Sequence, residues 1–173
     1  KAFDNRVCVT CLLALAERLY GKELPMNVVF LFSDEEELGM RGAKTAAFDI
    51  RADEAIALDV SFGDGPGISS YECGRLDGGP MIGVSPVLDR RISSRLLALA
   101  EESGITYQTE AMGGRTGTNA DVISVTRSGI ATGLVSVPIR NMHTPVETVS
   151  LNDISSACDL LERYILSGGV SND

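Results

Sequence analysis

The stretch that decides the fold reads VVFLFSDEEELGMRG and covers residues 28–42. Its first five residues are apolar and β-prone, which predicts a strand at residues 28–32 that is buried on both faces. Four acidic residues follow at 34–37, in the position where open α/β sheets carry their ligand sites. A solvated acidic turn before a helix is the alternative interpretation. Gly39 and Gly42 weaken it, because they leave little room for a solvated helical face.

Outward from this stretch, helical and strand-like patterns alternate along the chain. Amphipathic periodicity predicts helices from Asp4 to a stop at Gly21, at 41–48, at 89–103 and at 150–166, and a short helix opens from the glycine-rich loop 113–120. Apolar runs predict strands at 54–60, 68–71, 81–84, 106–111 and 131–138. In the last helix, Ser150 and Asp153 resemble a capping box, and Leu151 is expected to face inward. This order predicts an α/β fold with a mixed, mostly parallel sheet layered by helices.

The composition argues against several classes of protein. The length of 173 residues fits one domain of ordinary size. The net charge of −9 argues against nucleic acid and against an anionic membrane surface, and no apolar run reaches the length of a transmembrane helix. Cys8 and Cys11 form a C-x-x-C motif inside a helical pattern, where cysteine packs as a small apolar side chain. A reducing, cytoplasmic compartment is therefore expected.

Candidate metal-binding or acid–base groups recur where predicted strands or helices begin or end: Asp4, Glu36, Glu37, Asp59 and His143. The loops at one edge of a sheet can bring such groups together. Carboxylates with one imidazole suit zinc, cobalt or manganese. A cation would also relieve the repulsion between the carboxylates. The alternative is that His143, the only histidine, is a hydrogen-bonded loop residue without a ligand.

Five motifs, in this order and spacing, resemble those of one family. They are Asp4-Asn5-Arg6, Glu36-Glu37-Leu38-Gly39-Met40-Arg41-Gly42-Ala43, Ala57-Leu58-Asp59-Val60, Gly63-Asp64-Gly65-Pro66-Gly67 and Met142-His143-Thr144-Pro145-Val146-Glu147. The family is that of the glutamyl and tetrahedral aminopeptidases, which are dinuclear-metal exopeptidases. Each motif alone is weak, but five in order are specific, and the resemblance covers essentially the whole chain.

The resemblance implies a role for each candidate residue. Asp4 would bridge two divalent metal ions, zinc or cobalt. Glu37 and His143 would complete one metal site, and Asp59 would bind the other ion. Glu36 would be the general base that activates the bridging, metal-bound water and later protonates the leaving amine. The reaction implied is the release of an N-terminal amino acid from a peptide substrate.

Two departures from the family pattern qualify this expectation. The family has a further metal ligand in a His-x-Asp motif upstream of the segment at Asp4, and a small dimerisation domain is inserted between the two. Neither is found in residues 1–173, so we expect these residues to be the C-terminal part of a catalytic domain, with fewer than two tight metal sites. A homo-oligomer is expected of the full-length form. Asn119 replaces the usual aspartate of the Gly-Thr-Asp-Ala motif, so that loop loses a charge.

Three alternatives remain open. The chain could be a catalytically incompetent fragment that only folds and associates through exposed apolar surface. It could be a glycoside hydrolase that uses paired carboxylates roughly 5–9.5 Å apart, although adjacent residues such as Glu36 and Glu37 leave a strand in opposite directions. The loop 113–120 could cradle a phosphate, although it lacks the Lys-Ser/Thr ending of a P-loop.

Overall fold

The computed structural model of the chain describes residues 1–69, 71 and 73–170. Within these residues five strands form one mixed, mostly parallel sheet in the order β1–β4–β2–β3, and β5 is paired to the end of β4. The strands are β1 (Glu54–Phe62), β2 (Met81–Val84), β3 (Gln108–Ala111), β4 (Ala131–Arg140) and β5 (Thr148–Val149). The helices are α1 (Phe3–Leu19), α2 (Arg41–Asp49), α3 (Arg90–Glu102), α4 (Ala120–Ile123) and α5 (Leu151–Leu166). The predicted α/β class and sheet type are confirmed.

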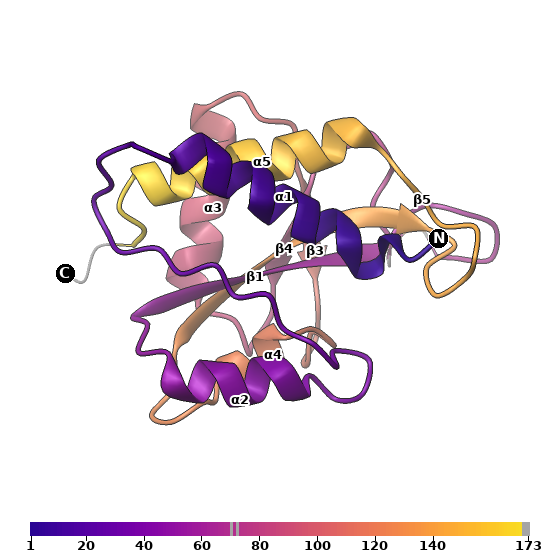
Figure 1. Cartoon of the computed structure of the whole chain (residues 1–173). Helices are drawn as coiled ribbons and strands as arrows, with labels where there is room; N and C mark the ends of the chain where they lie inside the picture. Colours follow the sequence, from indigo (N-terminus) through magenta and orange to yellow (C-terminus); the bar gives the residue numbers. More distant parts are fainter. Residues whose placement is uncertain (70, 72, 171–173) are drawn as a thin grey trace.

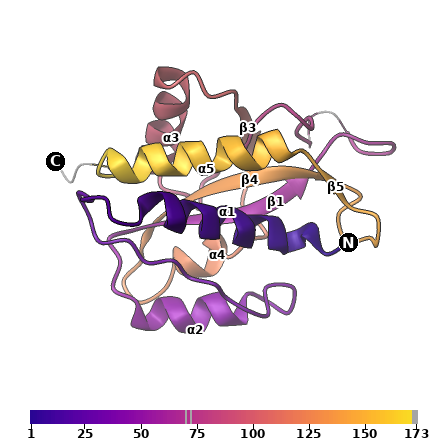
Figure 2. The same ribbon diagram turned by 45° about the horizontal axis from the view of Figure 1, so that its top comes forward.

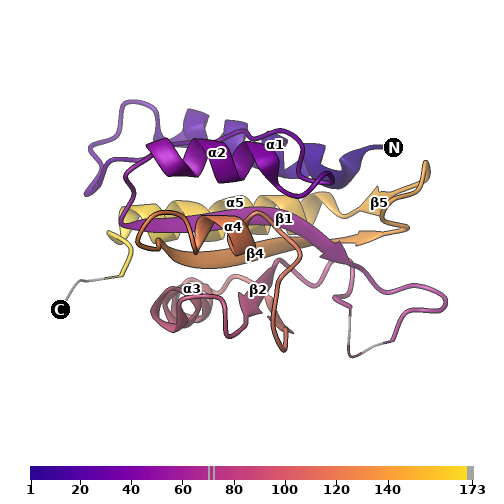
Figure 3. The same cartoon turned by 90° about the horizontal axis from the view of Figure 1, so that it is seen from below.

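Helices cover both faces of the sheet. The helices α1, α3 and α5 lie on one face, with α1 and α5 side by side, and α2 and α4 lie on the other (Figures 1 and 2). The view from below looks from the side of α2 and α4, with α4 in front of β1 and β4 (Figure 3). No helix in the described part of the chain has the length and apolar character that crossing a bilayer requires.

Strand β4 forms the centre of the core because its side chains alternate between the two faces. Val135, Val137 and Ile139 pack with α1, α3 and α5, whereas Leu134 packs in a smaller cluster on the opposite face. Gly133 belongs to the first face, where a Cβ would lie 2.5 Å from Cγ2 of Ile92. The absence of a side chain at this position therefore lets α3 approach the sheet.

The prediction of a strand at residues 28–32 is wrong. The segment is extended, but its backbone makes no hydrogen bond to another backbone group among the described residues. It is also not buried on both faces, since Val29 is 64% exposed. An apolar pattern indicates that a segment is extended and in contact with the core. A strand also needs a neighbouring strand about 4.8 Å away to which its backbone is hydrogen-bonded. The short strand predicted at 68–71 is likewise absent at residues 68, 69 and 71, and residue 70 lies outside the described residues.

The start of α5 differs from the predicted capping box. Ser150 does cap the helix, and its side chain accepts a hydrogen bond from the Asn152 N–H. Asp153, however, turns inward and accepts hydrogen bonds from the N–H groups of Asp77 (2.8 Å) and Gly79 (2.7 Å), which precede β2. Leu151 is 80% exposed instead of buried. A helical period of 3.6 residues does not say by itself whether Leu151 or Asp153 faces the core. Here the hydrogen bonds of the Asp153 carboxylate turn Asp153 inward and leave Leu151 exposed.

We expect Asp153→Asn to lower the free energy of unfolding by about 1–3 kcal/mol, because the buried Gly79 N–H or the partly buried Asp77 N–H loses its acceptor. Burial raises the pKa of Asp153, but the two N–H donors oppose that shift. Urea denaturation of both proteins measures the difference. Asp49→Asn is the matched control, since the Asp49 side chain is 90% exposed, and it should change stability by at most about 0.5 kcal/mol. Equal effects of the two substitutions would contradict a supporting role for Asp153.

Candidate metal centre

Three of the predicted ligands meet in one cluster. His143 Nε2 lies 3.1 Å from Asp4 Oδ2 and 3.4 Å from Glu37 Oε1. One ligand atom from each of the three residues lies within 4.8 Å of the others. Asp4 is at the start of α1, Glu37 is in the loop after segment 28–32, and His143 is in the loop after β4. The start of α1 and the loop after β4 lie at the same end of the molecule (Figure 1).

Asp59 lies in β1, within electrostatic reach of this cluster but outside the set of three. Its side chain is 6% exposed, and Oδ1 accepts hydrogen bonds from Asn5 Nδ2 (2.7 Å) and the Val60 N–H (2.9 Å). The pKa of Asp59 is raised to about 7, first by burial and then by the carboxylates of Glu36, Asp4 and Glu37. The hydrogen bond from the Val60 N–H acts in the opposite direction and lowers this pKa. A buried carboxylate that is this hard to ionise is a group that a cation would stabilise.

Glu36 and Glu37 differ in environment although they are adjacent. Glu36 is half-buried and Glu37 is exposed. Burial raises the pKa of Glu36, and the carboxylates of Glu37 and Asp4 raise it further. The loop that carries both residues closes tightly on itself, because a Cβ on Gly42 would lie 2.6 Å from the backbone N of Asp34. The two carboxylates can therefore take different roles, one as a ligand and one as a base.

Two residues that the sequence did not single out position this cluster. Glu147 is buried, and its two carboxylate oxygens accept hydrogen bonds from the Phe3 N–H (2.6 Å) and the His143 N–H (3.3 Å). The Asn5 side chain donates to both Asp59 and the Leu58 carbonyl. Both were quoted within motifs, but their contacts join segments far apart in sequence. No local pattern could reveal them.

The donor set fits a divalent cation. Two carboxylates and one imidazole nitrogen converge, and a further carboxylate lies buried nearby, which is the chemistry of zinc and related ions. The raised pKa values of Asp4, Glu36 and Asp59 share one cause besides burial, namely the repulsion between neighbouring carboxylates. A cation at this position would remove that repulsion. The arrangement therefore suits metal binding better than an uncompensated acidic patch.

The raised pKa of Asp59 gives a prediction for the metal-free protein. An aspartate in the unfolded chain titrates near pKa ~3.9, so the folded state binds this proton more tightly. Asp59 therefore makes its full contribution to the free energy of unfolding below pH ~4. This contribution, up to about 4 kcal/mol, is lost as the pH rises through about 7. Urea unfolding in a chelating buffer between about pH 5 and 7.5 should show this loss, and Asp59→Asn should remove most of it. If the free energy of unfolding of the variant depended on pH as strongly as that of the parent, another titrating group would be the cause.

Acidic side chains and one imidazole, gathered from distant loops beside a mostly parallel sheet, define the class of α/β proteins with a candidate divalent-metal site. The comparison with known proteins narrows this class. The family model described as M42 glutamyl aminopeptidase matches residues 1–160. The chain belongs to this family, as the motifs had indicated.

Three relatives show the extent of the similarity. The lysyl aminopeptidase of Pyrococcus furiosus is 32% identical over 162 residues, which are 94% of this chain and 46% of that protein. The structure of an aminopeptidase from Desulfurococcus kamchatkensis is 35% identical, with a TM-score of 0.89 over 96% of this chain and 48% of that one. The TET1 peptidase of Pyrococcus horikoshii is 30% identical, with a TM-score of 0.79 over 96% of this chain and 49% of that one. The chain thus spans about half the length of the relatives it matches.

Proposed function

We propose that residues 1–173 carry the general base and four metal ligands of the catalytic centre of a metal-dependent aminopeptidase that releases N-terminal amino acids from peptides. The observation that carries this proposal is the convergence of Asp4, Glu37 and His143, with Glu36 beside them. Membership of the M42 family and the similarity to a lysyl aminopeptidase support the substrate class.

The side chains divide into two sets of ligands. Glu37 and His143 would hold one divalent ion, Asp59 would hold a second, and Asp4 would bridge the two. Zinc and cobalt both suit these donors. When bound, the two ions would polarise the peptide carbonyl and lower the pKa of a coordinated water. Asn5 and Glu147 keep Asp59 and His143 in place through the hydrogen bonds described above.

Glu36 is the general base in this proposal. Its raised pKa makes its carboxylate a better proton acceptor than an ordinary exposed glutamate. It takes a proton from the attacking water as the oxygen–carbon bond forms. It then passes this proton to the leaving amine as the carbon–nitrogen bond of the peptide breaks. Water is consumed, and a free amino acid and a shortened peptide are released.

We also propose that residues 1–173 are the C-terminal part of a catalytic domain. The relatives support this, because each is about twice as long as the region that matches this chain. The Pyrococcus horikoshii relative is described as assembling into a tetrahedron or a large octahedral shell. We propose homo-oligomers for the full-length form of this chain as well.

An assay with aminoacyl p-nitroanilides tests the function. The purified chain is incubated with zinc or cobalt, and the release of p-nitroaniline is followed with and without a chelator. Metal-dependent release that stops on chelation is the expected result. Metal binding without any hydrolysis would favour the alternative of a catalytically incompetent domain.

A further inference from the structure

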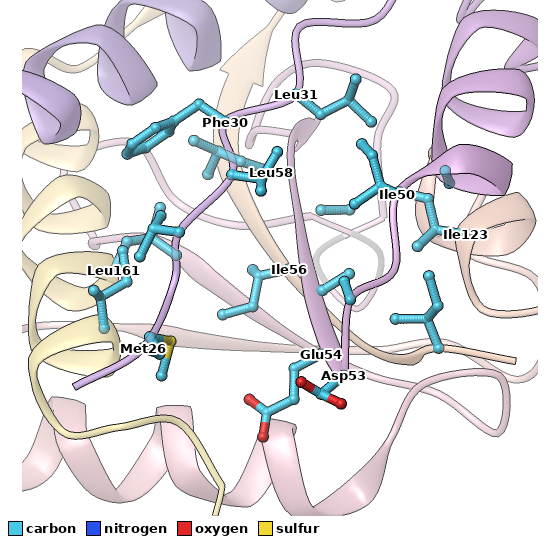
Figure 4. Close-up of a pocket in the computed structure, with 18 of the residues that line it drawn as sticks. Met26, Phe30, Leu31, Ile50, Asp53, Glu54, Ile56, Leu58, Ile123 and Leu161 are labelled. Carbon is cyan, nitrogen blue, oxygen red and sulfur yellow. The ribbon is translucent and has the colours of Figure 1, made fainter. Parts of the chain in front are cut away.

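The motif Gly63-Asp64-Gly65-Pro66-Gly67 contains none of the proposed metal ligands, yet it begins directly after β1, the strand that carries Asp59. Figure 4 follows β1 from Glu54 to Leu58, where the side chains of Ile56 and Leu58 line an apolar pocket. Asp59 is the next residue, and Asp64 lies beyond the end of the strand. Because β4 runs parallel to β1, the end of β4 lies beside this motif.

Arg140, the last residue of β4, donates two hydrogen bonds to Asp64. Its Nη2 donates to Asp64 Oδ2 (2.7 Å), and its Nε donates to the backbone carbonyl of Asp64 (2.5 Å). Both side chains are partly exposed, Arg140 by 43% and Asp64 by 41%. An exposed ion pair of this kind contributes little to stability, but two donors from one planar group fix the geometry of the pair. The pair is therefore better suited to setting a position than to stabilising the fold.

Asp64 is a firm anchor for Arg140 because other backbone groups also hold it. Its N–H donates to the Gly74 carbonyl (2.7 Å), and its Oδ1 accepts a hydrogen bond from the Leu76 N–H (3.1 Å). The N–H of the preceding Gly63 donates to the carbonyl of Ile139 in β4 (2.7 Å). The hydrogen bond from Arg140, and then that from the Leu76 N–H, lower the pKa of Asp64. The carboxylate is thus ionised at neutral pH and ready to pair with the guanidinium.

Arg140 also stands at the base of the hairpin that carries His143. It is paired with Thr148 of β5, so residues 141–147 form the loop of a β4–β5 hairpin. Asn141 and His143 have φ angles of 56° and 64° in this loop. A residue with a side chain adopts this left-handed region only where its surroundings hold it there. A loop with two such residues needs support at both ends.

The far end of this hairpin loop is supported by Glu147, whose carboxylate accepts hydrogen bonds from the N–H groups of His143 and Phe3. These bonds join the loop to α1. The near end is supported by the pair of Arg140 and Asp64, which joins it to β1. The imidazole is thereby tied to the two elements that carry the other buried or half-buried ligands.

We propose that Arg140 is a positioning residue for the metal centre: by binding Asp64, it sets where His143 lies relative to Asp59. This inference rests on the proposed function, in which those two ligands serve neighbouring ions. Lysine could not replace Arg140, because its single ammonium group cannot present two donors in a fixed plane to the carboxylate and the carbonyl of one residue. The loss of a group behind a metal ligand typically weakens metal binding by about 10–100-fold.

Arg140→Lys tests this proposal, and Arg91→Lys is the matched control. Arg91 also donates two hydrogen bonds to one aspartate, Asp89, through Nε (3.2 Å) and Nη2 (3.0 Å). The N–H of Asp89 donates to the carbonyl of Thr132, near the other end of β4 from Arg140. The same chemical change is therefore made at an exposed arginine–aspartate pair that is remote from the metal centre.

Hydrogen exchange in the metal-free chain measures the effect on the hairpin. In Arg140→Lys, the amides of His143 and Thr144 should exchange at least about tenfold faster, because the loop opens more often. Exchange in α3 should stay within about twofold, which separates local opening from a global loss of stability. Arg91→Lys should leave the hairpin unchanged. Faster exchange at Gly74 and Leu76 alone would show that the pair supports only the loop after β1, and would overturn the proposal.

Zinc affinity and the visible spectrum of bound cobalt measure the effect on the ligands, neither of which needs catalysis. Arg140→Lys should weaken zinc binding at least about tenfold and change the intensity of the cobalt absorption, whereas Arg91→Lys should leave the affinity within about twofold. If the parent binds zinc and Arg140→Lys binds it equally well, the role of Arg140 fails while the proposed function stands. If the parent itself binds no zinc, both fail.

A second variant tests whether Arg140 acts through Asp64. Asp64→Asn should also weaken zinc binding, because a neutral amide pairs less well with the guanidinium. The double variant should lose no more affinity than the weaker-binding single variant, since both substitutions break the same interaction. Losses that multiply in the double variant would show that the two residues act independently, and would overturn the proposal.

Discussion

Glu36→Gln is expected to lower the rate of aminoacyl p-nitroanilide hydrolysis by about 10²–10⁴-fold, the usual contribution of a positioned general base. Glutamine keeps the size of the side chain but cannot accept a proton from water. Because Glu36 lies outside the three clustered ligands, the affinity for zinc should change less than about threefold. The loss should therefore appear in kcat, with little change in KM. Steady-state kinetics and isothermal titration calorimetry measure the two effects separately.

Glu35→Gln is the matched control for this prediction. Glu35 neighbours Glu36 in sequence and is exposed, and among the described residues its side chain forms only a 3.8 Å ion pair with Arg41. Its substitution removes the same charge one residue away and should leave the rate within about twofold, because an exposed ion pair contributes little. Comparable losses in both variants would indicate a general electrostatic effect of the acidic loop. A rate that survives Glu36→Gln would remove Glu36 from the mechanism.

Asp4→Asn is expected to weaken zinc binding at least about 100-fold, since even the loss of a group behind a ligand costs about 10–100-fold. Asp4 is the carboxylate nearest to the His143 ring, and in the proposed function it contacts both ions. Its neutral amide is a poorer ligand and no longer balances the charge of the cation. Calorimetric titration of the unmodified chain should first show fewer than two tight sites. The variant should then show none in the same concentration range.

The control for Asp4 is again Asp49→Asn, at a position remote from the cluster and 90% exposed in its side chain. Circular dichroism should show that both variants keep the helix content of the parent. Asp4→Asn removes a partly buried carboxylate that repels Glu37, so it should not destabilise the metal-free fold. Undiminished zinc affinity in this variant would place the metal elsewhere.

The local sequence pattern predicted several helices and strands correctly, because the apolar side chains of the pattern pack on neighbouring elements in the folded chain. The amphipathic period at 89–103 became α3, with Ile92, Leu96 and Leu99 buried as expected. The apolar run at 54–60 became β1, and that at 131–138 became β4. Segment 28–32 failed as a strand for one physical reason. Its residues favour extension, but a strand is defined by a hydrogen-bonded partner, and the backbone of this segment has none among the described residues.

The sequence by itself determined the inventory of the candidate site: the five titratable groups, their order, and their positions near the ends of predicted elements. Only the tertiary structure decided that Asp4, Glu37 and His143 form one cluster while Asp59 stays buried beside it. It also decided that Glu147 and Asn5 connect these segments. The reason is that helical and strand periodicity are local, whereas distances and burial between residues more than 50 positions apart depend on how the helices pack on the sheet.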